Sequence, residues 1–462
     1  MNSFLQRGAM VALGLVIAAC SSGPGTKDDA TYSVPVEYHT LDNGLKVVLS
    51  EDRSAPTAVV AVYYNIGFRI EPEERTGFAH LFEHMMFQGS ENLGKMEFVR
   101  LIQRNGGVLN GSTRFDYTNY FEVVPSNVLE TVLWAEADRM KGLAITEENL
   151  VNQQGVVKNE VKVNVLNQPY GGFPWLWMPQ YANENWYNAH NFYGELEHLD
   201  AATLEDVQGF FDTYYAPNNA VVVVVGDFDR DQALGWIEKY FGGIKPAEVP
   251  PLPDLAEPRQ AKEKRFTRQD PLISRPGLAF AYHMPKRNTP EYFAMGMIDQ
   301  ILLQGDDSWL VQELVNEKGY AGELQGGINA MLGNMFNYNG PMLWMASLIH
   351  DPEVDADTIM ESVDAVIERL RNTEIDQATL ERALIKQRSS LYAQIEMFSG
   401  FGRADLLASF ALFDDDPARI NRLEEEFRKV TPELIRRTTE EYLRPTNRTV
   451  LRLVNDAAAQ EE

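Results

Sequence analysis

The sequence predicts an α+β protein made of two tandem homologous domains, each an antiparallel sheet packed against helices. Three observations predict this class: strand-like and helix-like stretches alternate along the chain, a proline-rich stretch interrupts its middle, and the second half repeats part of the first. At 462 residues the chain is too long for one ordinary hydrophobic core. Hydrophobic residues make up 44% of it, which is a globular composition.

The first half opens with a predicted hairpin, because Asn43-Gly44 lies between two β-rich stretches and this dipeptide is a strong hairpin signal. The elements expected next, in order, are a strand at 58–64, helices at 76–87 and 95–104, paired strands at 108–114 and 117–124, and helices at 129–142 and 146–165. Thr146 is the expected N-cap of the last helix.

A boundary is expected where five prolines fall between Pro246 and Pro258, a composition typical of an extended linker. The repeat lies on both sides of it. Five residues of the first half recur, with the same type, 228 positions later in the second half. They are Thr203, Glu205, Tyr214, Pro217 and Asn219, which correspond to Thr431, Glu433, Tyr442, Pro445 and Asn447. So long a period indicates duplicated domains, which we expect at 33–245 and 266–456 with a linker at 246–265.

The N-terminus resembles a bacterial lipoprotein signal. The apolar run 9–19 is too short to span a bilayer as a helix but suits the core of a signal peptide. Ile17-Ala18-Ala19-Cys20 resembles a lipobox, so we expect residues 1–19 to be removed, Cys20 to carry a lipid and residues 20–32 to form a tether. The residue after the cysteine, Ser21, resembles the type that sorts lipoproteins to the outer membrane. We therefore expect the protein in the envelope of a Gram-negative cell, facing the periplasm. A chance cysteine behind an ordinary cleaved signal is the alternative.

Composition limits the partners and the kinds of site. The net charge of −26 gives no electrostatic footprint for a nucleic acid. Solubility is the simplest interpretation of this acidity, and an acidic chamber that attracts cationic peptides is the alternative. Cys20 is the only cysteine, which excludes an internal disulfide and a zinc–thiolate site.

His80-Leu81-Phe82-Glu83-His84 has the HxxEH pattern. On a helix, both imidazoles lie on one face and can reach one ion, while Glu83 leans toward the same site without ligating it. A carboxylate in that place can take a proton from a water that zinc has acidified, so Glu83 is the candidate catalytic base. An ordinary pair of helical histidines is the alternative, although roughly 0.01 such matches are expected by chance.

Together with Gly107–Thr113 and Tyr214–Ala220, this motif resembles the pitrilysin/insulinase family of zinc metalloendopeptidases over nearly the whole mature chain. The resemblance implies a fold that forms one half of a clamshell, one Zn²⁺ per chain, and a glutamate third ligand 76 residues beyond the second histidine, which is Glu160. By propensity alone, Glu160 would be a solvated residue on a helix.

The resemblance also implies an edge strand that a peptide substrate extends as an added β-strand. The residues of this strand are Asn110, Gly111, Ser112 and Thr113. Without the family, they read as part of an ordinary hairpin.

Two departures from the family pattern stand out. The family commonly has a second glutamate seven residues before the third ligand, and here that position is Gln153, which can hydrogen-bond a ligand or water but brings no charge. Active members also carry an arginine and a tyrosine in the second domain. Those positions hold Asn316 and either Gly322 or Glu323 here, with Tyr320 as the nearest substitute.

The sequence therefore predicts a zinc-dependent endopeptidase that hydrolyses peptides or unfolded polypeptides in the cell envelope. It also predicts that the chain is the catalytic subunit of a heterodimer, in which a second family member supplies the missing arginine and tyrosine. The alternative is a non-catalytic structural or assembly subunit of a related complex. The intact HxxEH argues against that alternative, and against a closed zinc site that serves stability alone.

Overall fold

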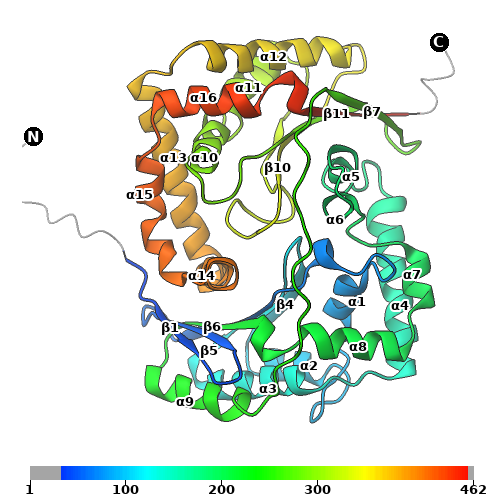
Figure 1. Ribbon diagram of the computed structural model, residues 1–462, viewed down its shortest axis with the longest axis vertical. Helices are drawn as coiled ribbons and strands as arrows, with labels where there is room; N and C mark the ends of the chain where they lie inside the picture. The colour runs from blue at the N-terminus through cyan, green and yellow to red at the C-terminus, as the bar shows by residue number, and fades with distance from the viewer. Residues whose placement is uncertain (1–32, 456–462) are drawn as a thin grey trace, which may run out of the picture. The chain divides into compact units, whose positions relative to one another are not determined.

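A computed structural model describes residues 33–455, in which the strands form two sheets, one in each half of the chain (Figure 1). The predicted signal peptide and Cys20 lie outside the described residues. The strands are β1 (Glu37–Thr40), β2 (Lys46–Glu51), β3 (Thr57–Tyr64), β4 (Val108–Thr113), β5 (Thr118–Pro125), β6 (Ala220–Gly226), β7 (Lys264–Gln269), β8 (Gly277–His283), β9 (Gln325–Ile328), β10 (Leu343–Ile349) and β11 (Arg448–Val454).

Helices fill most of the chain between these strands. They are α1 (Phe78–Met85), α2 (Glu97–Arg104), α3 (Leu129–Lys141), α4 (Glu147–Val161), α5 (Trp177–Ala182), α6 (Trp186–Ala189), α7 (Leu196–Ala201), α8 (Leu204–Tyr214), α9 (Arg230–Phe241), α10 (Pro290–Leu302), α11 (Trp309–Val311), α12 (Ala356–Asn372), α13 (Gln377–Glu396), α14 (Phe401–Asp414), α15 (Leu423–Arg428) and α16 (Pro432–Tyr442). Within the described chain, no helix is both long enough and apolar enough to cross a membrane.

The first sheet has the order β1-β2-β6-β3-β5-β4, and the second has the order β7-β11-β8-β10-β9. Apart from β1, the orders correspond strand for strand, which is the duplication that the sequence repeat predicts. The prediction of antiparallel sheets holds for every pair except β2–β6 and β7–β11, which are parallel. In both sheets the parallel partner is the last strand of its half and returns after a long helical stretch.

The repeated sequence positions make the same contacts in both halves. Thr203 and Thr431 each cap a helix by accepting a main-chain N–H. The Asn219 amide donates to the Tyr214 carbonyl (2.9 Å), and the Asn447 amide donates to the Tyr442 carbonyl (2.7 Å). Each asparagine therefore fixes the turn between a helix and the closing strand of its sheet.

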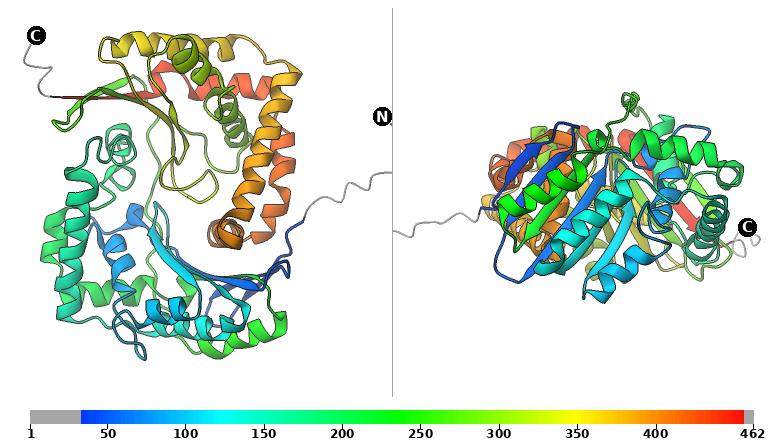
Figure 2. Two further views of the ribbon diagram at one scale, coloured as in Figure 1. Left: turned by 180° about the vertical axis from the view of Figure 1, so that it is seen from behind. Right: turned by 90° about the horizontal axis from the view of Figure 1, so that it is seen from below.

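In each half, a helix covers one face of the other half's sheet. One face of the first sheet packs on α1, α3, α8 and α9 of its own half, while the other face is covered by α14 from the second half, beside β2, β3 and β6 (Figures 1 and 2). The second sheet packs on α10, α12 and α16 through one face, and its other face is covered by α5 from the first half. The hydrophobic core is therefore shared between the halves.

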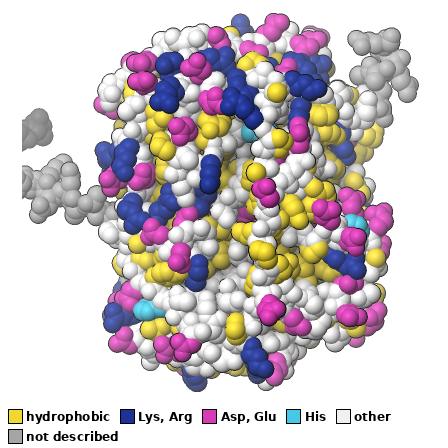
Figure 3. Space-filling view, in the orientation of Figure 1, with side chains coloured by type: hydrophobic (Ala, Val, Ile, Leu, Met, Phe, Trp, Pro, Cys, Tyr) yellow, Lys and Arg dark blue, Asp and Glu magenta, His cyan; other side chains and the backbone are white. Residues whose placement is uncertain are grey.

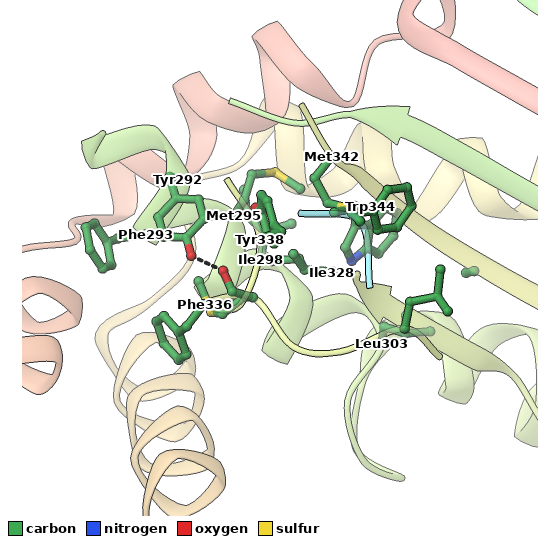
Figure 4. Close-up of a cluster of buried hydrophobic side chains, with 14 of the residues drawn as sticks. Tyr292, Phe293, Met295, Ile298, Leu303, Ile328, Phe336, Tyr338, Met342 and Trp344 are labelled. Atoms are coloured by element: carbon green, nitrogen blue, oxygen red, sulfur yellow. Dashed lines mark hydrogen bonds between the residues drawn. The ribbon is translucent and has the colours of Figure 1, made fainter. Parts of the chain in front are cut away.

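The core of the second half is rich in large side chains. Figure 4 shows Tyr292, Phe293 and Ile298 of α10 in the same buried cluster as Trp344 of β10. The Tyr292 hydroxyl donates to the main-chain carbonyl of Met335. The predicted linker crosses between the halves without regular secondary structure over residues 246–261. On the face seen in Figure 3, acidic and basic side chains are interspersed, and basic ones gather over its upper part.

Candidate metal centre

The two histidines of the HxxEH motif lie one turn apart on α1, which packs against α4. α1 starts at Gly77, whose φ of +85° and whose contact with the Tyr193 carbonyl leave no room for a side chain. The rings of His80 and His84 are 5.0 Å apart and nearly perpendicular. The motif therefore forms the helix face that the sequence predicts.

Glu160 on α4 lies opposite these two rings. Its carboxylate oxygens are 3.5 Å from His80 Nε2 and 3.2 Å from His84 Nε2. Two ligands of a tetrahedral zinc ion, each about 2.0 Å from it, lie about 3.3 Å apart, so the three side chains fit this ion. Among the described residues, they form the group of histidine and acidic side chains close enough to share a metal.

The electrostatics of the group favour an ionised Glu160. Hydrogen bonding to His80 and then to His84 lowers the pKa of the Glu160 carboxyl well below its usual range, against the opposing effect of burial. A carboxylate beside two neutral imidazoles is the donor set of an open catalytic zinc site.

Glu83 points from α1 toward β4, where its carboxylate is held by Thr113. The Thr113 hydroxyl lies 2.9 Å from Glu83 Oε2 and 3.3 Å from the Ala79 carbonyl. Thr113 is almost fully buried, and its hydroxyl lies beside the candidate base.

β4 is an edge strand of the first sheet, and among the described strands it pairs with β5 alone. Asn110 is exposed, and the Ser112 hydroxyl donates to Asn119 Oδ1 at 2.5 Å. The outer edge of this strand therefore has no partner among the described strands. The assignment of Asn110, Gly111, Ser112 and Thr113 as substrate contacts stays a prediction.

His80 is surrounded by aromatic rings. Its ring lies 5.2 Å from Tyr193 and 5.6 Å from Phe192, and its Nδ1 is buried without a hydrogen-bond partner among the described residues. Burial, Glu160 and Glu83 raise the pKa of Tyr193 to about 12, which keeps its hydroxyl neutral.

A buried carboxylate lies behind the metal helix. Glu71 accepts the main-chain N–H of Gly77 (2.9 Å) and of Ala79 (2.5 Å) and is completely enclosed. Burial raises its pKa to about 8, although the two N–H donors lower it. Sequence reasoning missed Glu71 and Tyr193, because neither belongs to a motif and each reaches the site only through the folded chain.

The residues at the two positions that depart from the family pattern lie in different parts of the structure. The Gln153 amide donates to Asn152 and, within residues 33–455, makes no hydrogen bond to the three candidate ligands. In the second half, Asn316, Gly322 and Glu323 are exposed, whereas Tyr320 is half-buried and accepts the Asp351 N–H through its carbonyl (2.9 Å). None of these four residues contacts the metal group through a hydrogen bond in the described chain.

Comparison with known proteins finds that two segments of this chain match models of one peptidase family. Residues 46–183 match the model described as Insulinase (Peptidase family M16), and residues 201–386 match the Peptidase M16 inactive domain. Zinc protease PqqE of Helicobacter pylori is 29% identical over 385 residues, covering 82% of this chain and 84% of that protein.

Solved structures agree with this assignment. The crystal structure of a protease from Helicobacter pylori superposes with a TM-score of 0.82 at 26% identity, covering 91% of this chain and 100% of that one. The periplasmic protease PqqL of Escherichia coli superposes with a TM-score of 0.74 at 17% identity, covering 94% of this chain but 49% of that one. The second likeness supports the fold alone.

Proposed function

We propose that this chain, which carries two domains of the M16 (insulinase) peptidase family, is a zinc-dependent endopeptidase that cleaves peptides or unfolded polypeptides. The observation that carries the proposal is the convergence of His80, His84 and Glu160 at zinc-like spacing, with Glu83 beside them. A closed structural site needs no such base.

The residues divide the chemistry between them. Zinc, when bound, polarises the scissile carbonyl and acidifies water. Glu83 takes the proton of the attacking water and delivers it to the leaving amine. Thr113 holds Glu83 through its hydroxyl, and the free edge of β4 aligns the peptide as an added strand, which demands little of its sequence.

Metal analysis and a peptidase assay test this proposal. We expect about one zinc per chain, and we expect Glu83→Gln to abolish hydrolysis while zinc stays bound, because Glu83 is not a ligand. Glu205→Gln, at an exposed position on α8, is the matched control and leaves both properties unchanged. Loss of zinc in Glu83→Gln, or full activity, contradicts the assigned roles.

The alternative is a non-catalytic subunit of a related complex. The observation that favours it is the match of residues 201–386 to a domain described as inactive. A chain that binds zinc but cleaves no peptide, alone or with any family partner, supports this alternative over the enzyme.

We further propose that the working enzyme is a heterodimer. This proposal is supported by Asn316 and by Gly322 or Glu323, which occupy positions where the family resemblance implies an arginine and a tyrosine. Losing one donor to a developing oxyanion costs on the order of 10²–10³ in rate, so the chain alone should cleave weakly.

Reconstitution with a second family member that lacks HxxEH tests the heterodimer. We expect that partner to raise kcat by a similar factor and to form a 1:1 complex by sedimentation. Full activity of the isolated chain rejects the heterodimer but leaves the zinc site intact, and Tyr320→Phe would then test that residue as the substitute donor.

The location is also a proposal, based on the Ile17-Ala18-Ala19-Cys20 junction. We propose a lipid on Cys20 that anchors the protein at the outer membrane, facing the periplasm. One acyl chain binds a membrane marginally, whereas several anchor it stably. Mass spectrometry should find a diacylglyceryl-modified Cys20 at the mature N-terminus, and an unmodified Cys20 removes the anchor.

A further inference from the structure

Among the described residues, no polar group binds the second ring nitrogen of His80, Nδ1. A metal-binding histidine usually donates its second ring N–H to a carboxylate, a carbonyl or a water. Here Nε2 faces Glu160, and Nδ1 finds no acceptor among the described residues, since Phe192 and Tyr193 lie against the ring. The direction of the ring must therefore depend more than usual on the main chain that carries it.

That main chain is held at the residue immediately before His80. The Ala79 N–H donates to Glu71 Oε1 (2.5 Å), and the Ala79 carbonyl lies 3.3 Å from the Thr113 hydroxyl. The second oxygen of Glu71 accepts the Gly77 N–H (2.9 Å), so one carboxylate spans the start of α1. Gly77 itself has no side chain to cap the helix, which leaves Glu71 in that role.

Glu71 has no arginine or lysine partner within residues 33–455. Arg69, two residues earlier, pairs with Asp116 at 2.8 Å. The nearest cationic candidate is His190, whose Nε2 lies 3.9 Å from Glu71, and both ring nitrogens of His190 lie within hydrogen-bond distance of main-chain carbonyls, those of Phe68 and Trp186. The hydrogen bonds of the Glu71 carboxylate are therefore those to the two N–H groups at the start of the metal helix.

We infer that Glu71 is a positioning residue, which sets the orientation of His80 for the metal by fixing the first turn of α1. The inference rests on the proposed function, in which His80 is a zinc ligand. It extends that function by naming a residue nine positions before the motif that makes no contact with metal or substrate.

The test compares Glu71→Gln with wild type and with Asp138→Asn. Glutamine has the same shape but only one acceptor oxygen, so its NH₂ opposes one of the two N–H donors. Asp138 is the matched control, because it is also a buried carboxylate that accepts a main-chain N–H, from Asn92 (3.0 Å), but on α3.

Three measurements do not depend on activity. In the metal-free protein, amide hydrogen exchange at Gly77 and Ala79 should accelerate in Glu71→Gln alone. Zinc affinity, measured by competition with a chelator, should fall on the order of 10–100-fold, as for other residues that orient ligands. The visible spectrum of the Co²⁺-loaded variant should change in intensity, and kcat should fall while KM stays constant.

The outcomes distinguish a failure of the proposed function from a failure of the role assigned to Glu71. Wild type that binds no zinc overturns the proposed function, whereas wild type that binds zinc with unchanged affinity and exchange in Glu71→Gln overturns only the role of Glu71. If Glu71→Gln does not fold, Glu71→Asp, which withdraws the carboxylate by one methylene, takes its place. If neither variant folds, Glu71 serves the whole fold and the specific role is rejected.

Discussion

The Thr113 hydroxyl lies 2.9 Å from a carboxylate oxygen of Glu83, joining the last residue of β4 to the candidate base on α1. The same strand offers its outer edge to a substrate. The strand that would hold the peptide thus also fixes the carboxylate that would act on it.

Replacing Thr113 by Val should lower kcat by about tenfold or more, because Glu83 loses the donor that aims it and proton transfer depends on alignment. Zinc content should not change, since no candidate ligand is touched. Thr118→Val is the matched control: its hydroxyl, on the paired strand, donates to the Ile66 carbonyl (2.8 Å) instead. Steady-state kinetics showing equal losses in both variants would assign the effect to the fold.

Breaking the ion pair between Arg69 and Asp116 should cost about 3–5 kcal/mol of unfolding free energy, because both groups are buried and the guanidinium would keep only neutral partners, Asn188 and the Pro341 carbonyl, among the described residues. Asp116 also accepts the Asn339 N–H (2.7 Å) from the second half, so the loss should loosen the contact between halves. Urea denaturation of Asp116→Asn measures the cost. The exposed pair of Arg230 and Asp231 is the comparison, and Asp231→Asn should leave the unfolding free energy nearly unchanged, because solvent screens exposed charges.

Stability should depend on pH through Asp299, a buried residue of α10 that accepts the Trp344 indole N–H (2.7 Å). Burial raises the pKa of Asp299 to about 6, so the folded state holds a proton that the unfolded chain releases near pH 4. Stability from this proton is therefore present at low pH and is lost as pH rises through about 6. Between about pH 5 and pH 8, Asp299→Asn should gain on the order of 1 kcal/mol relative to wild type in denaturation experiments. A constant difference between the two proteins contradicts the assignment.

Cutting the linker should not separate the halves, because α5 and α14 each bury against the opposite sheet. A protease site placed near Glu248 should yield two fragments that co-elute on size exclusion and unfold in one transition. Separate elution, or two transitions, would mean that the halves are independent domains.

Local patterns predicted much of the fold and the metal helix. Asn43-Gly44 and Thr146 act through neighbours in sequence, so the hairpin and the N-cap stand where predicted. Glu160 could be identified only from the ligand spacing of the family, because nothing in the neighbouring sequence distinguishes one glutamate on a helix from another. The contacts of Glu71 with Ala79 and of Thr113 with Glu83 depend on how strands and helices meet in space, which residue patterns do not encode.

The exchange of helices between the halves has a consequence for a chain that folds as it is made. When β6 closes the first sheet, the helix that covers its outer face has not been synthesised, since α14 begins at Phe401, some 175 residues after Gly226. At a synthesis rate of about 5–20 residues per second, roughly 10–35 s pass before α14 is made. During this time the apolar face that bears Val48, Ala61 and Val223 stays uncovered. The nascent chain is thus a substrate for holding chaperones during that interval, and the N-terminal half is the part that aggregates when they are scarce.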